Sequence, residues 1–356
     1  MITSIEIENL RGIGSGRLDG LMPLTILTGP NACGKSTVLD ALLIATSPTP
    51  EDAAGVAVQR HPAVPGGAKW LVGAPDKLAT LLVKTSSGLW LRRIKWLGHC
   101  QGAMRDRLLE RKARPPFSMI ALEELERSLL EDMADVGLSL EEQPIDDSVS
   151  ARTAFGADNQ YVGRPLGGRG LSQMSFVRLV DPGLPLPLHR TFAAAVRAGR
   201  RDDVYELLSA LVPEFERLEI LVEDDDTPSL YLTSAGRSVP VGLAGDGVQA
   251  FVQLALEVAV APEGLVLVEE PEVYQHPRAI WQTARVLLAN MRRGVQIVLT
   301  THSLELIDAL LAEANEDDLE KMALFNLLLE AGKLSSGRRA GEEIVFARQT
   351  LENDLR

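Results

Sequence analysis

The sequence predicts an α/β fold with a parallel sheet at its centre, and three observations lead to it. Two uniformly apolar runs, Leu265 to Val268 and Ile297 to Leu299, have the composition of strands that are buried on both faces. Between them, residues 278 to 291 carry apolar side chains at helical spacing. A third run, Leu24 to Leu27, precedes a glycine-rich segment and a further helical pattern. Strand, helix and strand in this order indicate parallel pairing.

Other elements follow from apolar patterns and turn residues. The segment Thr85-Ser86-Ser87-Gly88 lies between two strand-like runs and predicts a hairpin, and thus a small antiparallel sheet beside the parallel one. Helices are expected over residues 304 to 314 and near 341 to 355. Further strands are expected at Ile2 to Ile7, Ala79 to Val83, Leu89 to Ile94, Leu218 to Val222 and Leu230 to Leu232. The run Phe325 to Leu329 precedes a turn at residues 330 to 333.

The middle of the chain differs from both ends. Residues 97 to 213 mix helical stripes, such as residues 122 to 136, with proline- and glycine-rich breaks at 163 to 170 and 181 to 187. We expect an inserted, mainly helical subdomain there. The predicted organisation is an N-terminal lobe over residues 1–96, the insert over 97–213 and a C-terminal lobe over 214–356.

The composition is that of an ordinary soluble globular protein, because 46% of the 356 residues are hydrophobic and 4% are aromatic. The longest apolar region, Ala250 to Val268, is interrupted by acids and a proline, so no membrane-spanning helix is expected. The two cysteines, Cys33 and Cys100, cannot make a disulfide framework. We therefore expect a protein of the reducing cytoplasm.

Charge is unevenly distributed along this acidic chain. The formal net charge of −13 argues against a surface that binds nucleic acid as a whole. One basic stretch can nevertheless contact phosphate backbones or an acidic partner, although a solvated helix face is the simpler interpretation. It contains Arg92, Arg93, Lys95, Arg105, Arg107, Arg111, Lys112 and Arg114.

The glycine-rich segment after Leu27 has the spacing G-x-x-x-x-G-K-[ST] of a phosphate-binding loop. Its glycines allow backbone N–H groups to surround phosphate oxygens, Lys35 reaches the β and γ phosphates, and Ser36 offers a hydroxyl to Mg²⁺. The helix that begins here adds the positive end of its dipole. The sequence therefore predicts a nucleoside triphosphate site at Gly29, Pro30, Asn31, Ala32, Cys33, Gly34, Lys35, Ser36 and Thr37.

Two carboxylates and a histidine follow the later strands. Glu269 and Glu270 end the run from Leu265, at the carboxyl edge where ligands of open α/β sheets bind. One carboxylate can hold Mg²⁺ through water while the next orients the water that attacks the γ-phosphate. His302 can donate a hydrogen bond to that phosphate. The alternatives are an acidic loop after a core strand and a structural histidine.

A second glycine turn, Gly245-Asp246-Gly247, opens an apolar helix, whose N-terminus is another place where anions can bind. Within one chain this turn has no obvious target, because residues 29 to 37 already bind the phosphates. If two chains face each other head to tail, it covers the γ-phosphate of the partner's nucleotide. The alternative is an ordinary glycine cap.

The order of these motifs resembles that of the ABC-type ATPases, especially the branch with SMC-like proteins, RecF and the OLD-family ATPase domains. The matching phrases are residues 9 to 12, 28 to 40, 269 to 277 and 300 to 303, and the resemblance covers residues 1–50 and 215–310. The Glu-Glu-Pro-Glu phrase with its later His-Pro is most similar to OLD-like and AAA ATPase-like bacterial proteins.

This resemblance implies a P-loop fold with an ABC-like mixed sheet that binds ATP and Mg²⁺. It implies Lys35 on phosphate, Ser36 and Glu269 near the metal, Glu270 as the catalytic carboxylate and His302 as the switch histidine. It also implies that residues 245 to 247 form a loop similar to the signature loop of ABC-type ATPases, which we call the signature-like loop, and that this loop acts across a dimer.

Two positions depart from the family pattern. Glu269 stands where many ABC proteins have Asp, and Ala244 stands where a serine is common. Gln160 and Gln173 are weak candidates for the glutamine of the usual metal-linked loop.

We therefore expect an ATPase in which two Mg-ATP molecules hold two subunits together until hydrolysis releases them. Stand-alone relatives of this kind work with a separately encoded effector, often a nuclease, in phage defence or DNA repair. Two alternatives remain: an ATP-gated binding module with negligible turnover, and a RecF-like clamp that binds DNA in a salt-sensitive way through Arg92, Arg93 and Arg111.

Overall fold

The computed structural model describes residues 1–46, 70–74, 77–86, 88–98, 137–144, 151–155, 177–181, 187–222, 227–261 and 264–356. The helical stripe expected at residues 122 to 136 lies outside these ranges, as do Gln160, Gln173 and Cys100.

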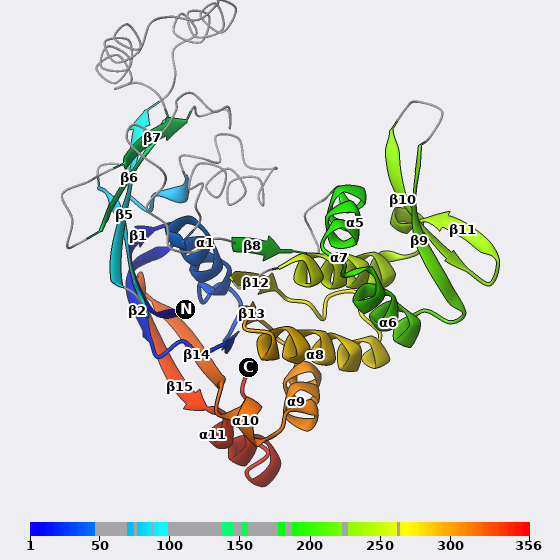
Figure 1. The fold of residues 1–356 in the computed structure, drawn as a ribbon. Coiled ribbons are helices and arrows are strands. Elements are labelled where there is room, and N and C mark those ends of the chain that lie inside the picture. Colours follow the sequence, from blue (N-terminus) through cyan, green and yellow to red (C-terminus); the bar gives the residue numbers. More distant parts are fainter. Residues whose placement is uncertain are drawn as a thin grey trace, which may run out of the picture.

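A long mixed sheet organises the fold (Figure 1). Within the described residues it has twelve strands, in the order β7-β6-β5-β4-β1-β2-β15-β14-β3-β13-β12-β8. These are β1 (Ile2–Leu10), β2 (Ile13–Asp19), β3 (Leu24–Thr28), β4 (Ala79–Thr85), β5 (Gly88–Gly98), β6 (Gly137–Pro144), β7 (Ala151–Phe155), β8 (Val177–Val180), β12 (Leu265–Glu269), β13 (Gln296–Thr300), β14 (Met322–Glu330) and β15 (Lys333–Ala340).

The two halves of this sheet pair differently. The strands from β14 through β3, β13 and β12 to β8 are parallel to one another, which confirms the predicted parallel centre. The strands from β7 to β2 pair antiparallel. The predicted hairpin of β4 and β5 exists, but the expectation of a separate small sheet was wrong. The reason is that β4 pairs with β1, so that the hairpin extends the main sheet.

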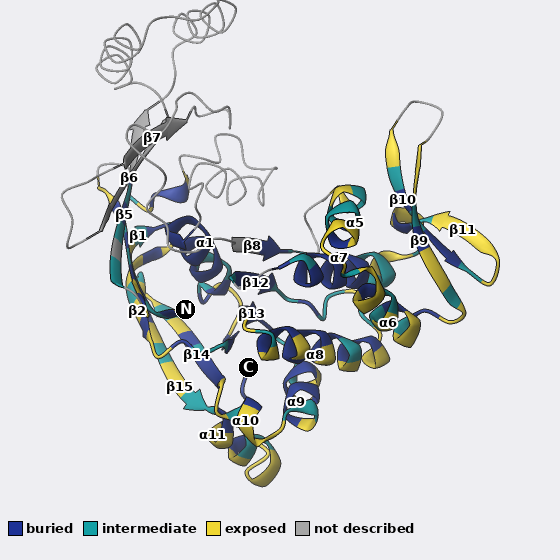
Figure 2. Cartoon of the chain, viewed as in Figure 1, coloured by how far each residue is buried: buried dark blue, intermediate teal, exposed yellow. Residues whose placement is uncertain are grey.

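The centre of the sheet lies between two hydrophobic cores. Val266 and Val268 of β12 contact one core, together with α7 (Asp246–Val260), α8 (Pro277–Arg292) and α9 (Leu304–Glu313). Leu265 and Leu267 point to the other core, which contains α1 (Lys35–Thr46). Figure 2 shows α8 with its buried side toward the sheet and exposed residues on its outer side. This alternation explains why the strand is apolar at every position.

The covering helices have the start signals that the sequence contains. Pro277 takes the first helical position of α8, where no N–H partner is needed, and His276 Nδ1 accepts the Arg278 N–H at 3.2 Å. Ser303 caps α9 by accepting the Leu306 N–H at 3.1 Å. Near the C-terminus, α10 (Glu316–Leu319) precedes β14. The expected closing helix is short, because α11 (Gly341–Val345) passes into a π-helical turn over Phe346–Thr350.

The range 97–213 is not purely helical. Its described residues supply β6, β7 and β8 of the main sheet as well as the helices α5 (Leu188–Arg197) and α6 (Arg201–Leu211). β6 pairs antiparallel with β5, and β7 pairs antiparallel with β6 at the edge of the sheet. The division into residues 1–96, 97–213 and 214–356 stays a prediction.

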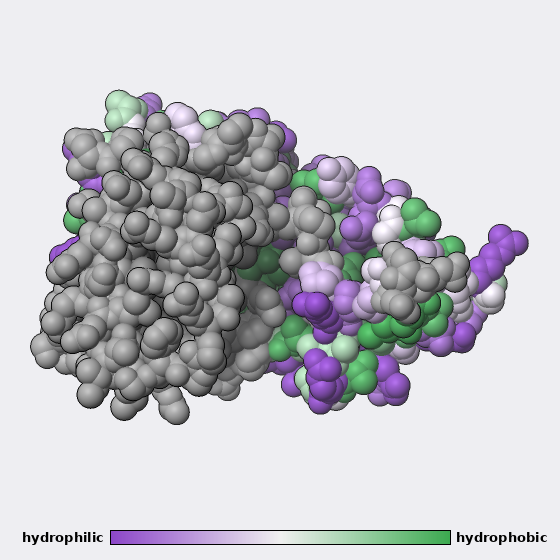
Figure 3. Space-filling view, turned by 90° about the horizontal axis from the view of Figure 1, so that it is seen from above, coloured by the Kyte–Doolittle hydropathy of each residue, from purple (hydrophilic) through white to green (hydrophobic). Residues whose placement is uncertain are grey.

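A second sheet of three strands projects beside α5 and α6 (Figure 1). It consists of β9 (Phe215–Val222), β10 (Pro228–Ser234) and β11 (Arg237–Pro240), and a 3-10 turn over Val241–Leu243 joins it to α7. Leu218, Leu230 and Leu232 are buried at its base, whereas Val222 is 65% exposed. In Figure 3 hydrophobic atoms lie among hydrophilic ones over this part of the surface.

Candidate nucleotide-binding site

The phosphate-binding loop connects the buried strand β3 to α1. Its first glycine, Gly29, has φ +134, and a Cβ there would lie 2.4 Å from the Leu327 carbonyl oxygen and 2.9 Å from Cys33 Sγ. No other residue type fits that position. Gly34, just before the helix, has φ +95, and Ala32 has φ +64. The loop is therefore held in a left-handed, tightly packed conformation that turns its backbone toward the N-terminus of α1.

Lys35 is folded back over this loop. Its Nζ donates to the carbonyl oxygens of Gly29 at 3.0 Å and Pro30 at 3.2 Å, and it lies 3.8 Å from Cys33 Sγ. The residue is only 6% exposed. A buried ammonium with these partners is held where phosphate oxygens would complete its hydrogen bonds.

The oxygen atoms for a metal ion meet between α1 and β12. Ser36 Oγ donates a short hydrogen bond to Glu269 Oε1, although 233 residues separate them. A hydroxyl and a carboxylate are the hard oxygen ligands that Mg²⁺ takes in nucleotide sites, where phosphate and water supply the remainder. The predicted pair therefore fits the metal, and the longer side chain at the position where Asp is common reaches the serine. Among the described residues, no group of three or more His, Cys, Asp or Glu forms a metal site.

The predicted residues end neighbouring strands at one edge. The pairing register sets Leu27 of β3 beside Thr300 of β13 and Thr300 beside Glu269 of β12. The residues that follow each strand, Gly29, His302 and Glu270, therefore emerge at the same edge. Sheet topology alone thus brings together motifs that are about 240 residues apart in the chain.

Glu270 and His302 face each other across this edge. Their Oε1 and Nε2 atoms are 3.3 Å apart, and both side chains are 34% exposed, so they can reach a ligand. Glu270 has φ +39, which an L-residue adopts only under constraint. Its N–H donates to the Thr300 carbonyl oxygen and to Thr300 Oγ1, both at 3.1 Å. Two acceptors on one residue of β13 thus fix the backbone that aims this carboxylate.

Glu272 is a site residue that the sequence did not single out. Its Oε1 accepts the Thr301 hydroxyl at 2.6 Å and the His302 N–H at 2.9 Å. Burial raises the pKa of this carboxyl, partly offset by these hydrogen bonds. The Glu-Glu-Pro-Glu motif could have drawn attention to Glu272, but its contact with Thr301 forms only in the folded chain.

The signature-like loop has the geometry expected for the start of a helix. Gly245 is the N-cap of α7 with φ +96, and no atom lies within 4 Å of a Cβ built on it. Gly247 is close-packed, because its Cβ would lie 2.5 Å from the Tyr274 carbonyl oxygen. The loop therefore touches the segment that follows Glu270. A role of Asp246 and its neighbours across a dimer stays a prediction.

The basic stretch is only partly supported. Arg92 is 2% exposed, and its guanidinium donates a short hydrogen bond to the Ile44 carbonyl oxygen near the end of α1. It cannot contact a nucleic acid, so this part of the prediction was wrong. The physical reason is that carbonyl groups in the last helical turn lack backbone partners and attract a cation. Arg93 is partly exposed. The Lys95 side chain and residues 105 to 114 lie outside what the structure describes.

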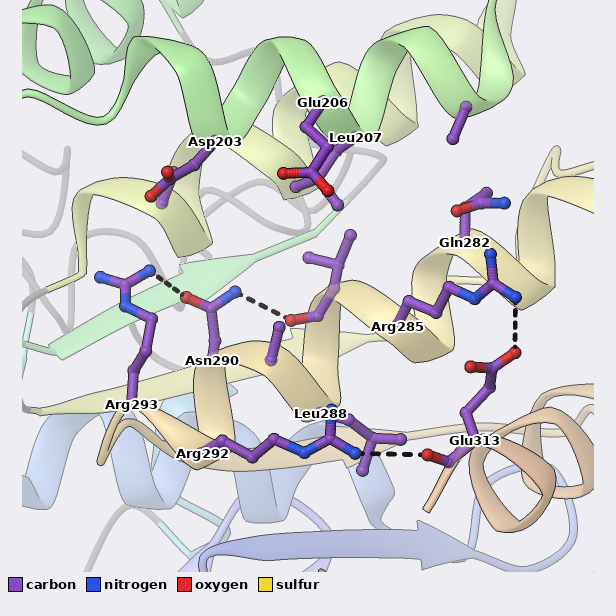
Figure 4. A pocket seen from close by; sticks show the side chains of 14 residues that line it. Asp203, Glu206, Leu207, Gln282, Arg285, Leu288, Asn290, Arg292, Arg293 and Glu313 are labelled. Atoms are coloured by element: carbon purple, nitrogen blue, oxygen red, sulfur yellow. Dashed lines mark hydrogen bonds and ion pairs between the residues drawn. The ribbon is translucent and has the colours of Figure 1, made fainter. Parts of the chain in front are cut away.

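A pocket of about 490 Å³ lies elsewhere, between α6 and α8 (Figure 4). None of the predicted site residues lines it. Two pairs of its polar side chains are bonded to each other: Arg285 binds Glu313 at 2.9 Å, and Arg293 donates to Asn290 Oδ1 at 2.7 Å. Among the described helices, none is both long and apolar enough to span a membrane.

Two family models match the chain. One is described as "AAA domain, putative AbiEii toxin, Type IV TA system" and matches residues 161–308. The other is described as "AAA domain" and matches residues 4–58. The second range holds the phosphate-binding loop, and the first holds the signature-like loop, the carboxylates after β12 and the histidine after β13.

Solved structures of SMC heads have a similar fold. The SMC head bound to the C-terminal winged-helix domain of ScpA is 13% identical, with a TM-score of 0.54 over 95% of this chain and 97% of that one. An SMC head with an extended coiled coil, bound to the C-terminal domain of ScpA derived from Pyrococcus furiosus, is 11% identical, with a TM-score of 0.53 over 99% of both chains. At these identities the likeness establishes the fold, an α/β P-loop ATPase fold.

A curated relative matches by sequence. The uncharacterized protein MJECL11 of Methanocaldococcus jannaschii is 32% identical over 110 residues, which are 31% of this chain and 87% of that protein. Taken with the AAA-domain matches and the SMC-head fold, this identity over most of the relative makes the chain an ABC/SMC-like AAA ATPase-domain protein that belongs to one family with MJECL11.

Proposed function

We propose that the chain binds and hydrolyses ATP with Mg²⁺, and that two ATP molecules hold two copies together. The observation that carries the proposal is the meeting of Ser36 with Glu269 and of Glu270 with His302 at one edge of the sheet. Phosphoryl transfer needs positioned charges and donors more than covalent chemistry, and this edge supplies both.

Each residue then has a role that its position supports. Lys35 binds the phosphates, while Ser36 and Glu269 hold Mg²⁺, which neutralises charge that develops on the phosphoryl group. Glu270 orients the attacking water and accepts its proton. His302 donates a hydrogen bond to the γ-phosphate. Because its Nε2 lies 3.3 Å from Glu270 Oε1, His302 links the presence of that phosphate to Glu270.

The arrangement of the helices supports action across a dimer. The α1 helix, which starts at the phosphate-binding loop, and the α7 helix, which starts at the signature-like loop, pack into different cores on opposite faces of the central sheet. A loop that opens α7 is therefore available to a second copy. Hydrolysis would remove the γ-phosphate that both copies contact, and the copies would separate.

The output we propose is control of a separately encoded effector, of the nuclease kind, in phage defence or DNA metabolism, with the chain working in the cytoplasm. The support is the family description that names a toxin of a type IV toxin–antitoxin system. The resemblance to OLD-like proteins in the Glu-Glu-Pro-Glu phrase points the same way. The fold is compatible with either setting.

Replacing Glu270 by Gln tests hydrolysis and dimerisation together. This change keeps the size of the side chain and removes the charge, so we expect phosphate release to fall by about 10²- to 10⁴-fold while ATP affinity is retained. In size-exclusion chromatography with ATP and Mg²⁺, the Glu270→Gln variant should run as a stable dimer. Lys35→Ala should bind no ATP and stay monomeric. Glu320→Gln, the same change on an exposed side chain, is the control.

Two outcomes would refute the proposal. If the wild-type chain releases no more phosphate than Glu270→Gln, the chain is an ATP-gated binding module. If both run as monomers with saturating ATP, nucleotide does not join the copies. A DNA clamp receives less support because Arg92 is buried. It would need salt-sensitive DNA binding that neutralisation of Arg93 weakens.

A further inference from the structure

Glu272 joins the two loops that form the nucleotide site. It lies two residues after Glu270, in the turn that follows β12, and its Oε1 reaches the segment that follows β13. There the oxygen accepts both the Thr301 hydroxyl at 2.6 Å and the His302 N–H at 2.9 Å. These contacts span 29 and 30 residues of sequence. The mechanism proposed above gives Glu272 no task.

The burial of this carboxylate costs stability. Its second oxygen, Oε2, is buried and has no hydrogen-bond partner among the described residues. Desolvation disfavours the charged form of such a group more than its two hydrogen bonds favour it. Perturbed carboxylates cluster at functional sites, and this one lies beside Glu270 and bonds the segment that carries His302.

The segment that Glu272 holds is fixed from three sides. The Thr301 N–H donates to the Leu27 carbonyl oxygen at 3.1 Å, at the end of the strand that leads to the phosphate-binding loop. The Thr301 hydroxyl accepts the Ser303 N–H at 2.9 Å while donating to Glu272. The residues on both sides of His302 are therefore held by hydrogen bonds, and the His302 N–H supplies a third.

The other end of Glu272 is tied to the catalytic carboxylate. Pro271 separates it from Glu270, and the Val273 N–H donates to the Glu270 carbonyl oxygen at 3.0 Å, which closes a turn around Glu272. The side chain of Glu270 meets the His302 imidazole at 3.3 Å. His302 is thus bound at its backbone by Glu272 and at its ring by Glu270.

We propose that Glu272 is the positioning residue that keeps His302 within reach of Glu270 and of the γ-phosphate. The proposal rests on the function proposed above and adds a residue to it. Glu272 touches neither substrate nor reacting atoms, so it acts only through the residues it holds. Without it, the segment from Thr301 to Ser303 loses both hydrogen bonds to Glu272, and only the His302 ring still contacts the β12 loop, at Glu270. A misplacement of about 1 Å in such a group costs roughly 100-fold in rate.

Three variants separate positioning from a general loss of structure. Glu272→Ala removes both hydrogen bonds, and we expect kcat to fall about 100-fold with ATP affinity within about twofold of wild type. Glu272→Gln keeps an acceptor oxygen and should restore most of the lost rate. Thr301→Val is nearly isosteric and removes only the hydroxyl, so kcat should fall about tenfold.

The matched control is Glu257→Gln. Glu257 is another buried carboxylate, 2% exposed on α7, and it accepts the Thr191 hydroxyl at 2.9 Å. It repeats the chemistry of the Glu272 to Thr301 contact at a place away from the phosphate-binding loop. This variant should leave kcat unchanged. It shows what loss of a buried charge does by itself.

A second readout does not depend on hydrolysis. Because Glu272 accepts the His302 N–H, that amide should be protected from hydrogen–deuterium exchange in the wild type, measured by mass spectrometry on the peptide that contains it. Glu272→Ala should expose it, and Glu272→Gln should restore its protection.

The results decide between the two proposals. A Glu272→Ala chain that keeps kcat within twofold of wild type, or that loses ATP affinity in proportion to kcat, overturns the positioning role. If Glu272→Ala does not fold, an unchanged kcat in Thr301→Val overturns it. If the wild type does not hydrolyse ATP, the proposed function fails. The exchange result then decides: faster exchange at His302 in Glu272→Ala supports the anchor, and unchanged exchange overturns it.

Discussion

Gly247 should be the most sensitive glycine in the signature-like loop, because α7 packs there on residues 270–275, which we propose to be catalytic through Glu270 and call the catalytic loop. A Cβ at this position would lie 2.5 Å from the Tyr274 carbonyl oxygen. Gly247→Ala must therefore separate α7 from that loop by about 0.9 Å before an ordinary contact of 3.4 Å is restored. Neither partner is a flexible side-chain end, so the shift must be taken up by backbone.

The displacement should reach Glu270. Tyr274 follows Val273, whose N–H donates to the Glu270 carbonyl oxygen at 3.0 Å, so movement of this turn moves the Glu270 carboxylate. A shift of about this size costs roughly 100-fold in kcat. The overpacking itself should lower the free energy of unfolding by about 1 to 3 kcal/mol. ATP affinity should stay near that of wild type, because residues 29 to 37 are not touched.

Two neighbouring glycines provide controls for the same substitution. Gly242→Ala meets no atom within 4 Å and should change neither kcat nor the melting temperature measurably. Gly245→Ala also meets no atom, but φ is +96 there, so it should cost about 1 to 3 kcal/mol of stability through backbone strain without pushing the catalytic loop. Phosphate release and thermal unfolding are measured on all three. If Gly247→Ala hydrolyses ATP as fast as Gly242→Ala, the packing of the signature-like loop on the catalytic loop does not position Glu270.

Three further predictions concern stability. The folded state binds a proton at Glu272 more readily than the unfolded state, because the pKa of this carboxyl is raised by folding. Protonated Glu272 therefore stabilises the folded state below the ordinary pKa of 4.5, and this stabilisation is lost as the pH rises through the raised folded value. Glu272→Gln should therefore be more stable than wild type at pH 7, and this difference should shrink toward pH 4; a less stable variant at pH 7 would contradict the direction of the shift. Asp40→Ala breaks the buried contact with Arg11 at 3.0 Å and should cost about 3 to 5 kcal/mol in urea unfolding. Gln296→Ala removes the two 2.8 Å hydrogen bonds to the Ile2 backbone and should lower the free energy of unfolding by about 2 to 4 kcal/mol. A decrease of less than about 1 kcal/mol would contradict this expectation.

The sequence was informative where the chemistry is local. The phosphate-binding loop, the strand that precedes it and the helix that follows it lie within 23 residues, so the spacing of glycines and apolar residues suffices. The strands β12 and β13 were likewise evident, because burial on both faces requires an apolar residue at nearly every position.

The strands β2 and β15 could not be predicted for the opposite reason. They are rich in glycine, serine and arginine and show no alternation. Each pairs with the strand that precedes it, but they also pair with each other across more than 300 residues: the Gly14 N–H donates to the Gly332 carbonyl oxygen at 2.7 Å. A Cβ at Gly16 would lie 2.5 Å from Leu334 Cβ, so the glycine allows an approach that no local pattern announces.

Arg92 and Glu272 show how charge misleads when only composition is considered. Arg92 belongs to the basic stretch and Glu272 to the Glu-Glu-Pro-Glu motif, yet both point inward, where each binds backbone groups of a distant segment. Their partners, Ile44 and His302, are 48 and 30 residues away. A charged side chain can be buried only where it meets a hydrogen-bond donor or acceptor, and that partner is in place only once the sheet has formed.

Three strained or buried groups lie at the same edge of the sheet, and their position explains how they are tolerated. Glu270 with φ +39, Ala32 with φ +64 and the desolvated Glu272 all lie at the carboxyl edge of β3, β13 and β12. These three strands are fully paired and are packed by a core on each face, so their ends cannot relax separately. Strain persists only where the surroundings fix the backbone, and the two Thr300 acceptors do this for Glu270. The rigid centre of the sheet therefore allows the nucleotide site to be assembled in advance, which lowers the reorganisation that phosphoryl transfer would otherwise require.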